Sequence, residues 1–381
     1  MMNDIQPFFT AIKRQGIDFF AGVPDSLLKD FCAYITDHTT ADEHVITANE
    51  GNAVALAAGH FLGSGRYGLV YMQNSGIGNA INPLMSLTDP EVYSIPMLVI
   101  VGWRGEPGVK DEPQHVKQGR IMPSILKSLE IPWFEIDAKS SNIEDVIDDA
   151  CSLMKDRSMP VVIMVRKGSF STYPMRTLSE VDFVLSREDA ICQIVDNLQP
   201  ADLVVSTTGM ASRELNEYRI KRGEGNGYDF LTVGSMGHTV SIAAGVARSQ
   251  PKHQVICLDG DGSVIMHMGA LAVTGQSGLS NLIHIVLNNG AHGSVGGQPT
   301  VGFKVDLPTI ATSCGYEMVS SVSELNQITS ELARLRQSDG PSFLEIKLNK
   351  NFRDNLSRPK TTPLQNRDAF MARLKLESEP V

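Results

Sequence analysis

Two segments decide the fold: Val255–Ser263 (VICLDGDGS) and Leu282–Asn289 (LIHIVLNN). Each begins with an apolar run of the length and composition typical of a buried strand. The residues between them, around Met268–Ala272, are compatible with a crossover helix, so the two strands are expected to be parallel neighbours. Because parallel strands end at the same edge of a sheet, Asp261 and the Asn288–Asn289 pair are expected to converge there. Oxygen ligands of this kind suit Mg²⁺.

The rest of the chain alternates apolar strands and helices in two series. Strands are expected at 16–23, 67–72, 96–102, 161–165, 203–206, 255–258, 282–287 and 343–348, and helices at 27–36, from Glu50 onward, at 190–198 and at 241–247. Two alternating series predict an α/β protein with two doubly wound parallel-sheet domains. We expect the first domain over 1–170, a linker rich in polar residues over 171–186, and the second domain over 187–381, ending in a polar tail that begins at Asn351.

Composition excludes several classes of protein. The net charge of −10 at pH 7 argues against general nucleic-acid binding. Five scattered cysteines with no C-x-x-C pair favour free thiols in a reducing compartment over disulfides or a zinc site. The N-terminus lacks a signal-peptide pattern, and no apolar run reaches membrane-spanning length. We therefore expect a cytoplasmic protein that binds neither nucleic acid nor membrane.

The ordered set of strand, Gly-Asp-Gly, helix, strand and Asn-Asn resembles the signature of thiamin-diphosphate-dependent enzymes. A lone Gly-Asp-Gly is more often a simple tight turn, but the full set at this spacing is specific. The resemblance implies a metal, Mg²⁺, held by the side chains of Asp261 and Asn289 and by the backbone carbonyl of Ala291. It also places the diphosphate against the segment Gly260, Gly262 and Ser263.

The same resemblance assigns further cofactor contacts. Members of this family use a glutamate at the start of a small-residue helix to activate the cofactor, and Glu50 matches that position. The alternative is that Glu50 has only a structural role, as an acidic residue favoured at a helix N-terminus by the helix dipole. Thr208 and Gly209 follow a strand in a similar turn. Ser235 and Met236 match the segment whose bulky side chain bends the cofactor, although a buried core methionine is the competing interpretation of Met236.

Four further segments narrow the resemblance to the phosphonopyruvate decarboxylase family: Gly22–Leu28, Tyr71–Gly76, Trp103–His115 and Asn289–Gln298. The similarity extends from about Phe8 to Lys347. It implies a pyrimidine-binding domain followed by a diphosphate-binding domain, and cleavage of 3-phosphonopyruvate to phosphonoacetaldehyde and CO₂ in phosphonate biosynthesis. It also implies a homodimer or a dimer of dimers with active sites at the subunit interface.

Decarboxylation requires an acid that protonates the carbon left after CO₂ is lost. By resemblance, Asp25 and His115 are the candidates, while a turn or N-cap role for Asp25 and a surface-loop role for His115 are the alternatives. The anionic group of the substrate requires cations or hydrogen-bond donors. The candidates for that role are Arg104, Lys110, Arg213, Ser26 and Ser294, any of which is otherwise an ordinary surface residue.

Other functions remain open. Sulfopyruvate decarboxylase resembles the same family, and a sulfonate and a phosphonate are both tetrahedral anions. The fused chain and Asp25 after Gly-Val-Pro favour the phosphonate. A lyase acting on another 2-keto acid is a third possibility. A nicotinamide dehydrogenase is disfavoured because its G-x-G-x-x-G fingerprint is missing, and a non-catalytic subunit is disfavoured because Glu50, Asp261 and Asn289 are all present.

Overall fold

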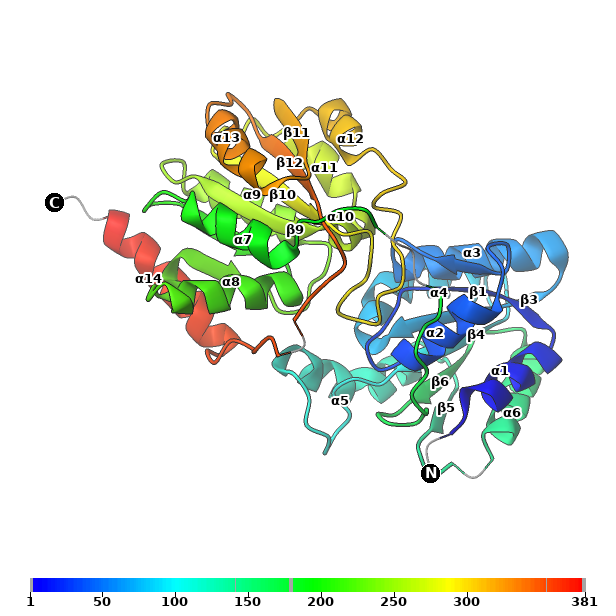
Figure 1. Cartoon of the computed structure of the whole chain (residues 1–381). Coiled ribbons are helices and arrows are strands. Elements are labelled where there is room, and N and C mark those ends of the chain that lie inside the picture. Colours follow the sequence, from blue (N-terminus) through cyan, green and yellow to red (C-terminus); the bar gives the residue numbers. More distant parts are fainter. Residues whose placement is uncertain (1–2, 141, 178–180, 354, 379–381) are drawn as a thin grey trace. The chain divides into compact units, whose positions relative to one another are not determined.

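The computed structural model describes residues 3–140, 142–177, 181–353 and 355–378. Its internal contacts divide the chain into two compact units. Unit 1 consists of residues 1–179 with 294–298, and unit 2 consists of residues 180–293 with 299–381. Both are α/β units with a parallel sheet and flanking helices, so the predicted fold class is confirmed (Figure 1).

Unit 1 contains a six-stranded parallel sheet in the order β2-β1-β3-β4-β6-β5. Its strands are β1 (Ile17–Gly22), β2 (His44–Ile46), β3 (Tyr67–Gln73), β4 (Met97–Gly102), β5 (Trp133–Ile136) and β6 (Val161–Val165). Its helices are α1 (Ile5–Arg14), α2 (Lys29–His38), α3 (Glu50–Ser64), α4 (Ile77–Leu87), α5 (Pro113–Ser128) and α6 (Ile143–Arg157), and a 3₁₀ turn, η1 (Asn74–Gly76), joins β3 to α4.

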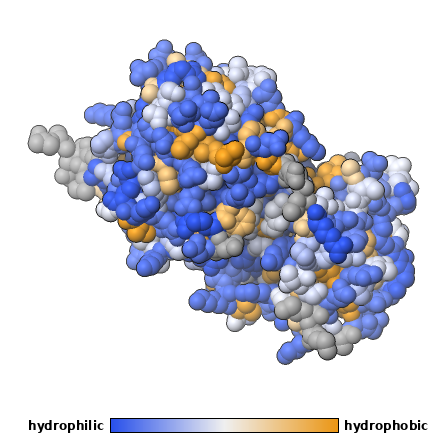
Figure 2. Space-filling model, viewed as in Figure 1, coloured by the Kyte–Doolittle hydropathy of each residue, from blue (hydrophilic) through white to orange (hydrophobic). Residues whose placement is uncertain are grey.

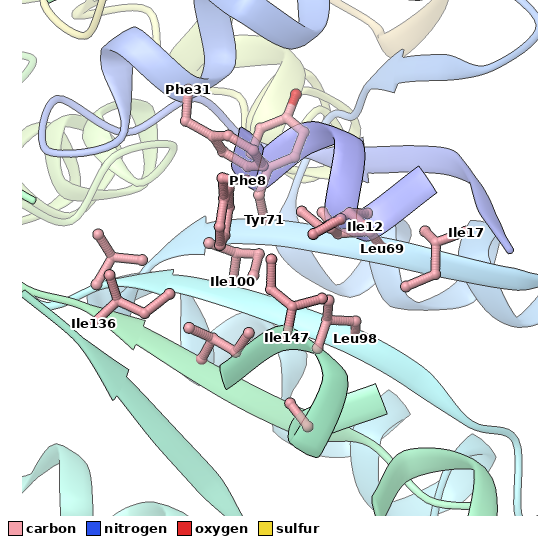
Figure 3. Packing of buried hydrophobic residues seen from close by; sticks show 14 of the residues in the cluster. Phe8, Ile12, Ile17, Phe31, Leu69, Tyr71, Leu98, Ile100, Ile136 and Ile147 are labelled. Atoms are coloured by element: carbon pink, nitrogen blue, oxygen red, sulfur yellow. The ribbon is translucent and has the colours of Figure 1, made fainter. Parts of the chain in front are cut away.

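Two apolar layers stabilise unit 1, one on each face of its sheet. Figure 3 shows one of them, where Phe8 of α1 and Phe31 of α2 pack over Tyr71 and Ile100 of the central strands. The rings of Phe8 and Phe31 meet edge to face, with centroids 5.3 Å apart. The strands β4 and β6 are buried at every position because helices cover both faces, which explains their unbroken apolar sequence.

Unit 2 repeats the architecture with the sheet order β11-β12-β10-β9-β7-β8, again all parallel. Its strands are β7 (Leu203–Ser206), β8 (Asp229–Leu231), β9 (Val255–Gly260), β10 (Leu282–Asn288), β11 (Met318–Val322) and β12 (Ser342–Lys347). Its helices are α7 (Arg187–Asp196), α8 (Met210–Lys221), α9 (Thr239–Ser249), α10 (Asp261–Met266), α11 (Gly269–Gly275), α12 (Leu307–Cys314), α13 (Leu325–Leu335) and α14 (Pro363–Ser378).

Several local expectations need correction. The predicted crossover helix between β9 and β10 is present as α11, and a further short helix, α10, precedes it and begins at Asp261. The helix expected at 27–36 begins at Lys29, and no side chain caps it. Within the predicted linker, the backbone N–H of Tyr173 donates to Asp30 of α2 at 2.9 Å. Residues 178–180 lie outside the described part of the chain.

The predicted polar tail contains the helix α14. Its Phe370 is buried against the sheet of unit 2. The side chain of Asn366 accepts a hydrogen bond from Leu231 N at 3.0 Å and donates one to Asp229 O at 2.8 Å, both on the edge strand β8. The tail therefore belongs to the folded unit. No helix in the described part of the chain is long and apolar enough to cross a membrane.

Candidate active site

The predicted site residues fall into two groups, one on each unit. In unit 1, the carboxyl ends of β1, β3 and β4 lead into the segments that contain Asp25, Asn74 and Arg104. Glu50 begins α3, which follows the edge strand β2. In doubly wound sheets, this carboxyl edge is where ligands bind, because the loops that leave neighbouring strands meet there.

Asp25 is fully buried, with a relative exposure of 0%. Its Oδ2 accepts a hydrogen bond from Leu28 N at 3.3 Å, whereas Oδ1 has no hydrogen-bond partner among the described residues. Burial raises the pKa of this carboxyl from 3.8 to about 6, against the lowering effects of nearby backbone N–H groups and of Arg104. A buried acid with a free oxygen and a pKa near neutrality is suited to proton transfer.

Arg104 is already bonded on several sides. Its Nε donates to Asp111 Oδ2 at 2.8 Å, and its two terminal nitrogens bond to Asp111 and to Ser26. The Arg104 guanidinium and two backbone N–H groups together hold the pKa of Asp111 well below its usual range, against the opposing effect of its burial. Arg104 is thereby held beside Ser26, another predicted substrate contact, whereas Lys110 is exposed on the same loop.

His115 lies in the first turn of α5 and is only 8% exposed. The surface-loop alternative is therefore wrong for this residue. The turn is positioned by a close contact, because a Cβ added to Gly105 would overlap the carbonyl of His115. The sequence held a signal for this helix that we did not use, since Pro113 occupies its first position, where proline is favoured.

Glu50 is the first residue of α3 and is 5% exposed. Its Oε2 accepts a hydrogen bond from Asn79 Nδ2 of α4 at 2.7 Å. A Cβ added to Gly76 would overlap Glu50 Oε1, so only glycine at position 76 leaves room for this carboxyl group. Sequence reasoning did not identify Asn79 or Gly76. The Asn-Ser-Gly turn after β3 was the available signal, because glycine often marks close approach to a functional group.

In unit 2, three loops at the carboxyl edge of the sheet are tied together by hydroxyl groups. Ser263 Oγ accepts hydrogen bonds from Gly237 N at 3.1 Å and from Thr207 Oγ1 at 3.4 Å. Thr208 Oγ1 accepts one from Gly234 N at 3.1 Å. These bonds bring together three of the predicted cofactor segments: 207–209, 234–237 and 260–263.

The predicted metal ligands lie at the ends of β9 and β10. Asp261 is 2% exposed, and burial raises the pKa of its carboxyl to about 6. The backbone N–H groups of Asn289 and Gly262 counteract this shift, which places both beside the carboxyl group. Asn289 Oδ1 accepts a hydrogen bond from Ala291 N at 3.2 Å. The expected convergence of Asp261 with the residues after β10 is thus present in the structure.

Met236 and His292 both approach the Gly-Asp-Gly segment. A Cβ added to Gly262 would lie 3.4 Å from Met236 Cε and 3.1 Å from His292 Cε1. Met236 is only partly buried, so it is not a core methionine. Burial lowers the pKa of His292 to about 4, which leaves its imidazole neutral at pH 7. A flexible thioether and a neutral ring thus line the segment predicted to contact the diphosphate.

Arg213 and Ser294 were also predicted to contact the substrate. Arg213 lies on α8 of unit 2 and is half-buried, with an interaction partner of its own. Ser294 is exposed. The roles of both residues in substrate binding stay predictions.

The residues of unit 2 suit thiamin diphosphate and a divalent metal. A buried carboxyl group with a raised pKa is stabilised in its ionised form by a bound cation. The groups around Asp261 are oxygen donors and backbone amides, as a hard cation and a diphosphate require. In unit 1, Glu50 offers a carboxyl group with one oxygen held by Asn79 and the other facing a glycine. Both halves therefore have the chemistry that this cofactor needs.

Comparisons with known proteins agree with this assignment. Residues 3–125 match the family described as "Thiamine pyrophosphate enzyme, N-terminal TPP binding domain". Residues 207–346 match "Thiamine pyrophosphate enzyme, C-terminal TPP binding domain". The chain therefore contains both thiamine-pyrophosphate-binding domains of this enzyme family.

Three curated relatives align over nearly the whole chain. The phosphonopyruvate decarboxylase of Streptomyces viridochromogenes is 35% identical over 94% of this chain and 91% of its own length. The phosphonopyruvate decarboxylase of Streptomyces hygroscopicus is 35% identical over 91% of this chain and 88% of its own. The sulfopyruvate decarboxylase of Methanosarcina acetivorans is 29% identical over 91% of both chains. Because this last relative is also a fused chain, domain fusion does not separate the two activities.

Proposed function

We propose that this chain, which belongs to the family of thiamine-pyrophosphate-dependent decarboxylases, splits 3-phosphonopyruvate into phosphonoacetaldehyde and CO₂. Thiamin diphosphate, bound with Mg²⁺, supplies the nucleophilic carbon and the electron sink for this cleavage. We assign pyrimidine binding to the domain of residues 1–170 and diphosphate binding to the domain of residues 187–381, joined by the linker 171–186.

Glu50 is proposed to hold the cofactor and to exchange a proton with its aminopyrimidine ring. The bond from Asn79 fixes Glu50 Oε2, which leaves Oε1 for that exchange. In unit 2, we propose that Asp261, Asn289 and the Ala291 carbonyl hold Mg²⁺, and that Gly260, Gly262, Ser263, Thr208 and Gly209 surround the diphosphate. Ser235 and Met236 are proposed to support the cofactor's rings.

The observation that best supports a decarboxylase of this kind is Oδ1 of Asp25, which is buried and has no hydrogen-bond partner among the described residues. An acid with a pKa of about 6 is partly protonated near neutral pH, so Asp25 can donate a proton to the substrate carbon that loses CO₂. His115, buried in the first turn of α5, is the proposed second proton carrier. Water is excluded from Asp25 by its complete burial, which limits loss of the proton to solvent.

The phosphonate is proposed to bind through Arg104 and Ser26, with Lys110, Arg213 and Ser294 as further contacts. Arg104 is preorganised by Asp111, and guanidinium groups suit tetrahedral dianions. Sulfopyruvate is the rival substrate, since it differs only in that anionic group. The phosphonate is favoured by the two relatives named for it, which are 35% identical to this chain, against 29% for the sulfopyruvate enzyme.

A homodimer, or a dimer of dimers, is the proposed assembly, with the active site shared between subunits. Figure 2 shows a face that is largely hydrophilic, with apolar residues gathered in patches. Large apolar side chains are exposed on α3, which begins at Glu50, and on α4, which bonds Glu50 through Asn79. Leu62 of α3 is 72% exposed and Met85 of α4 is 54% exposed. Exposed apolar residues on neighbouring helices favour contact with another subunit. Light scattering after gel filtration tests this assembly.

We also propose a cytoplasmic role in phosphonate biosynthesis. All five cysteines are free in the structure, as expected in a reducing compartment. Irreversible loss of CO₂ would draw forward the unfavourable reaction that supplies a phosphonopyruvate.

The test of the proposed function is CO₂ release with thiamin diphosphate and Mg²⁺, comparing phosphonopyruvate, sulfopyruvate and pyruvate at equal concentrations. We expect kcat/KM to be highest for phosphonopyruvate, with phosphonoacetaldehyde as the product. A preference for sulfopyruvate would overturn the substrate assignment and leave the cofactor roles of Glu50 and Asp261 in place. Absence of CO₂ release from all three substrates would overturn the proposed reaction.

A further inference from the structure

The segment Pro299–Phe303 folds back over the loop that follows β10. An isolated antiparallel bridge pairs Pro299 with Ala291. Thr300 N donates a hydrogen bond to Gly290 O at 3.0 Å. These backbone contacts hold the segment against the loop that contains the proposed metal ligands Asn289 and Ala291.

Side chains from the sheet hold the other end of the segment. Asn288 Nδ2 donates to Gly302 O at 2.9 Å and to Glu345 Oε1 at 2.8 Å. Glu345 lies on β12, is 2% exposed, and accepts a second hydrogen bond from Ser321 Oγ at 2.7 Å. The segment is thus anchored through Asn288 to a buried carboxylate inside the sheet.

The hydroxyl group of Thr300 links this segment to Asp261. Thr300 Oγ1 accepts a hydrogen bond from Gly302 N at 3.0 Å and donates one to Asp261 Oδ2. Since a hydroxyl group has a single proton, and the Gly302 N–H occupies one of its acceptor positions, that proton is available to the carboxylate. One oxygen of Asp261 is therefore held by a specific donor from a different loop.

Gly302 makes this arrangement sterically possible. A Cβ added at this position would lie 2.5 Å from Asp261 Oδ2 and 2.7 Å from Asn288 Oδ1. Real Cβ atoms do not approach oxygen so closely, so any side chain there would push the segment away from both groups.

We propose that Pro299–Phe303 is a clasp for the metal site and that Thr300 is a positioning residue, which fixes Asp261 Oδ2 and leaves Oδ1 to bind the divalent cation. This inference rests on the metal assignment within the proposed function, and it is independent of which 2-keto acid is the substrate. Groups that orient a metal ligand in this way commonly change metal affinity by about 10- to 100-fold when they are removed.

The test measures metal and cofactor binding to the full-length protein without substrate. Wild type is compared with Thr300→Val, which removes the hydroxyl group at nearly constant size, and with Thr300→Ser, which retains it. Thr312→Val is the matched control, because Thr312 is exposed on α12 and its hydroxyl donates to Pro308 O within the same helix. Free Mn²⁺ is measured by electron paramagnetic resonance in the presence of thiamin diphosphate, and cofactor retention is measured by equilibrium dialysis.

We expect Thr300→Val to weaken Mn²⁺ binding about 10- to 100-fold, and Thr300→Ser and Thr312→Val to bind within about threefold of wild type. Gly302→Ala breaks the same clasp from the backbone side, and we expect it to weaken Mn²⁺ binding similarly. Wild-type affinity in Thr300→Val would overturn the clasp. Equal weakening in Thr300→Val and Thr300→Ser would also overturn it, by assigning the effect to packing.

The outcomes separate this inference from the proposed reaction. If wild type retains no Mn²⁺ with thiamin diphosphate, both the metal assignment and the clasp fail. If wild type binds both but releases no CO₂ from phosphonopyruvate, the reaction fails while the clasp is still judged by the Thr300→Val result. Thermal melting of each variant without metal or cofactor identifies any variant that is unfolded. If Thr300→Val is unfolded, Gly302→Ala takes its place in the comparison.

Discussion

Asp25 in unit 1 and Asp261 in unit 2 occupy similar places but have different surroundings. Each follows a strand at the carboxyl edge of its sheet, each is buried, and burial raises the pKa of each to about 6. Both carboxyl groups face backbone N–H groups, but Asp25 has one oxygen without a hydrogen-bond partner among the described residues, whereas one oxygen of Asp261 is bonded by the Thr300 hydroxyl.

The difference shows that burial alone does not define the role of an acidic residue. A carboxyl group with a free oxygen can take up or release a proton with little rearrangement. A carboxyl group that is bonded by a side-chain hydroxyl from another loop is held in one orientation, which suits a metal ligand. Three substitutions, which give four predictions, test the assigned roles in order of decreasing expected effect.

Asp261→Ala should have the largest effect. Without its carboxylate, the protein should lose Mg²⁺ and thiamin diphosphate, and CO₂ release should fall by more than about 10³-fold. Equilibrium dialysis measures the loss of cofactor, and Asp339→Ala, which removes an exposed carboxylate of unit 2, is the control. Normal retention of cofactor in Asp261→Ala would contradict its role as a metal ligand.

Glu50→Gln should abolish turnover without loss of cofactor. The amide can still accept a hydrogen bond from Asn79 but cannot exchange a proton, so we expect kcat to fall about 10³-fold. Dialysis should show thiamin diphosphate retention close to that of wild type. Glu91→Gln, an exposed position in the same unit, is the control, and near-normal kcat in Glu50→Gln would refute the assignment.

Asp25→Asn should reduce kcat about 10²-fold while leaving Mn²⁺ and cofactor binding unchanged, because Asp25 lies in the other unit and is proposed to act only on substrate. The pH profile of kcat should lose its ionisation near pH 6. Weakened metal binding in this variant would remove the distinction between the two aspartates.

The same variant should gain stability at neutral pH. The folded-state pKa of Asp25 is raised from 3.8 to about 6, so the unfolded chain releases its proton first and wild-type stability falls as the pH rises through this window. Between about pH 4.5 and about pH 7, wild type should lose about 2 kcal/mol relative to Asp25→Asn. Urea unfolding at the two pH values measures this difference, and a constant difference would indicate an unperturbed carboxyl group.

The fold could be predicted from sequence wherever a strand is buried on both faces. The strands Val161–Val165 and Leu203–Ser206 have the predicted bounds, because both are buried at every position and, apart from Ser206, consist of apolar residues. Helix starts were less predictable. α2 begins two residues later than expected, and Asp25 bonds the backbone N–H of Leu28, the residue before the helix, instead of a group within it.

The positions of the site residues were predictable, but their partners were not. Glu50, Asp261 and Asn289 lie in ordered motifs with fixed spacing. Thr300, in contrast, reaches Asp261 across 39 residues of sequence, and no local pattern distinguishes it from other loop threonines. The partnership of Arg104 with Asp111 likewise depends on a loop whose shape is fixed only after folding.

The contact between Asn366 and β8 covers an open edge of the sheet in unit 2. β8 is an edge strand, and its outward-facing N–H and C=O groups would otherwise be open to pairing with a strand of another molecule. The amide of Asn366 makes the two hydrogen bonds that a neighbouring strand would make. Proteolysis or truncation before α14 would therefore leave a strand edge beside the apolar surface that Phe370 covers, and would convert the folded unit into a template for aggregation.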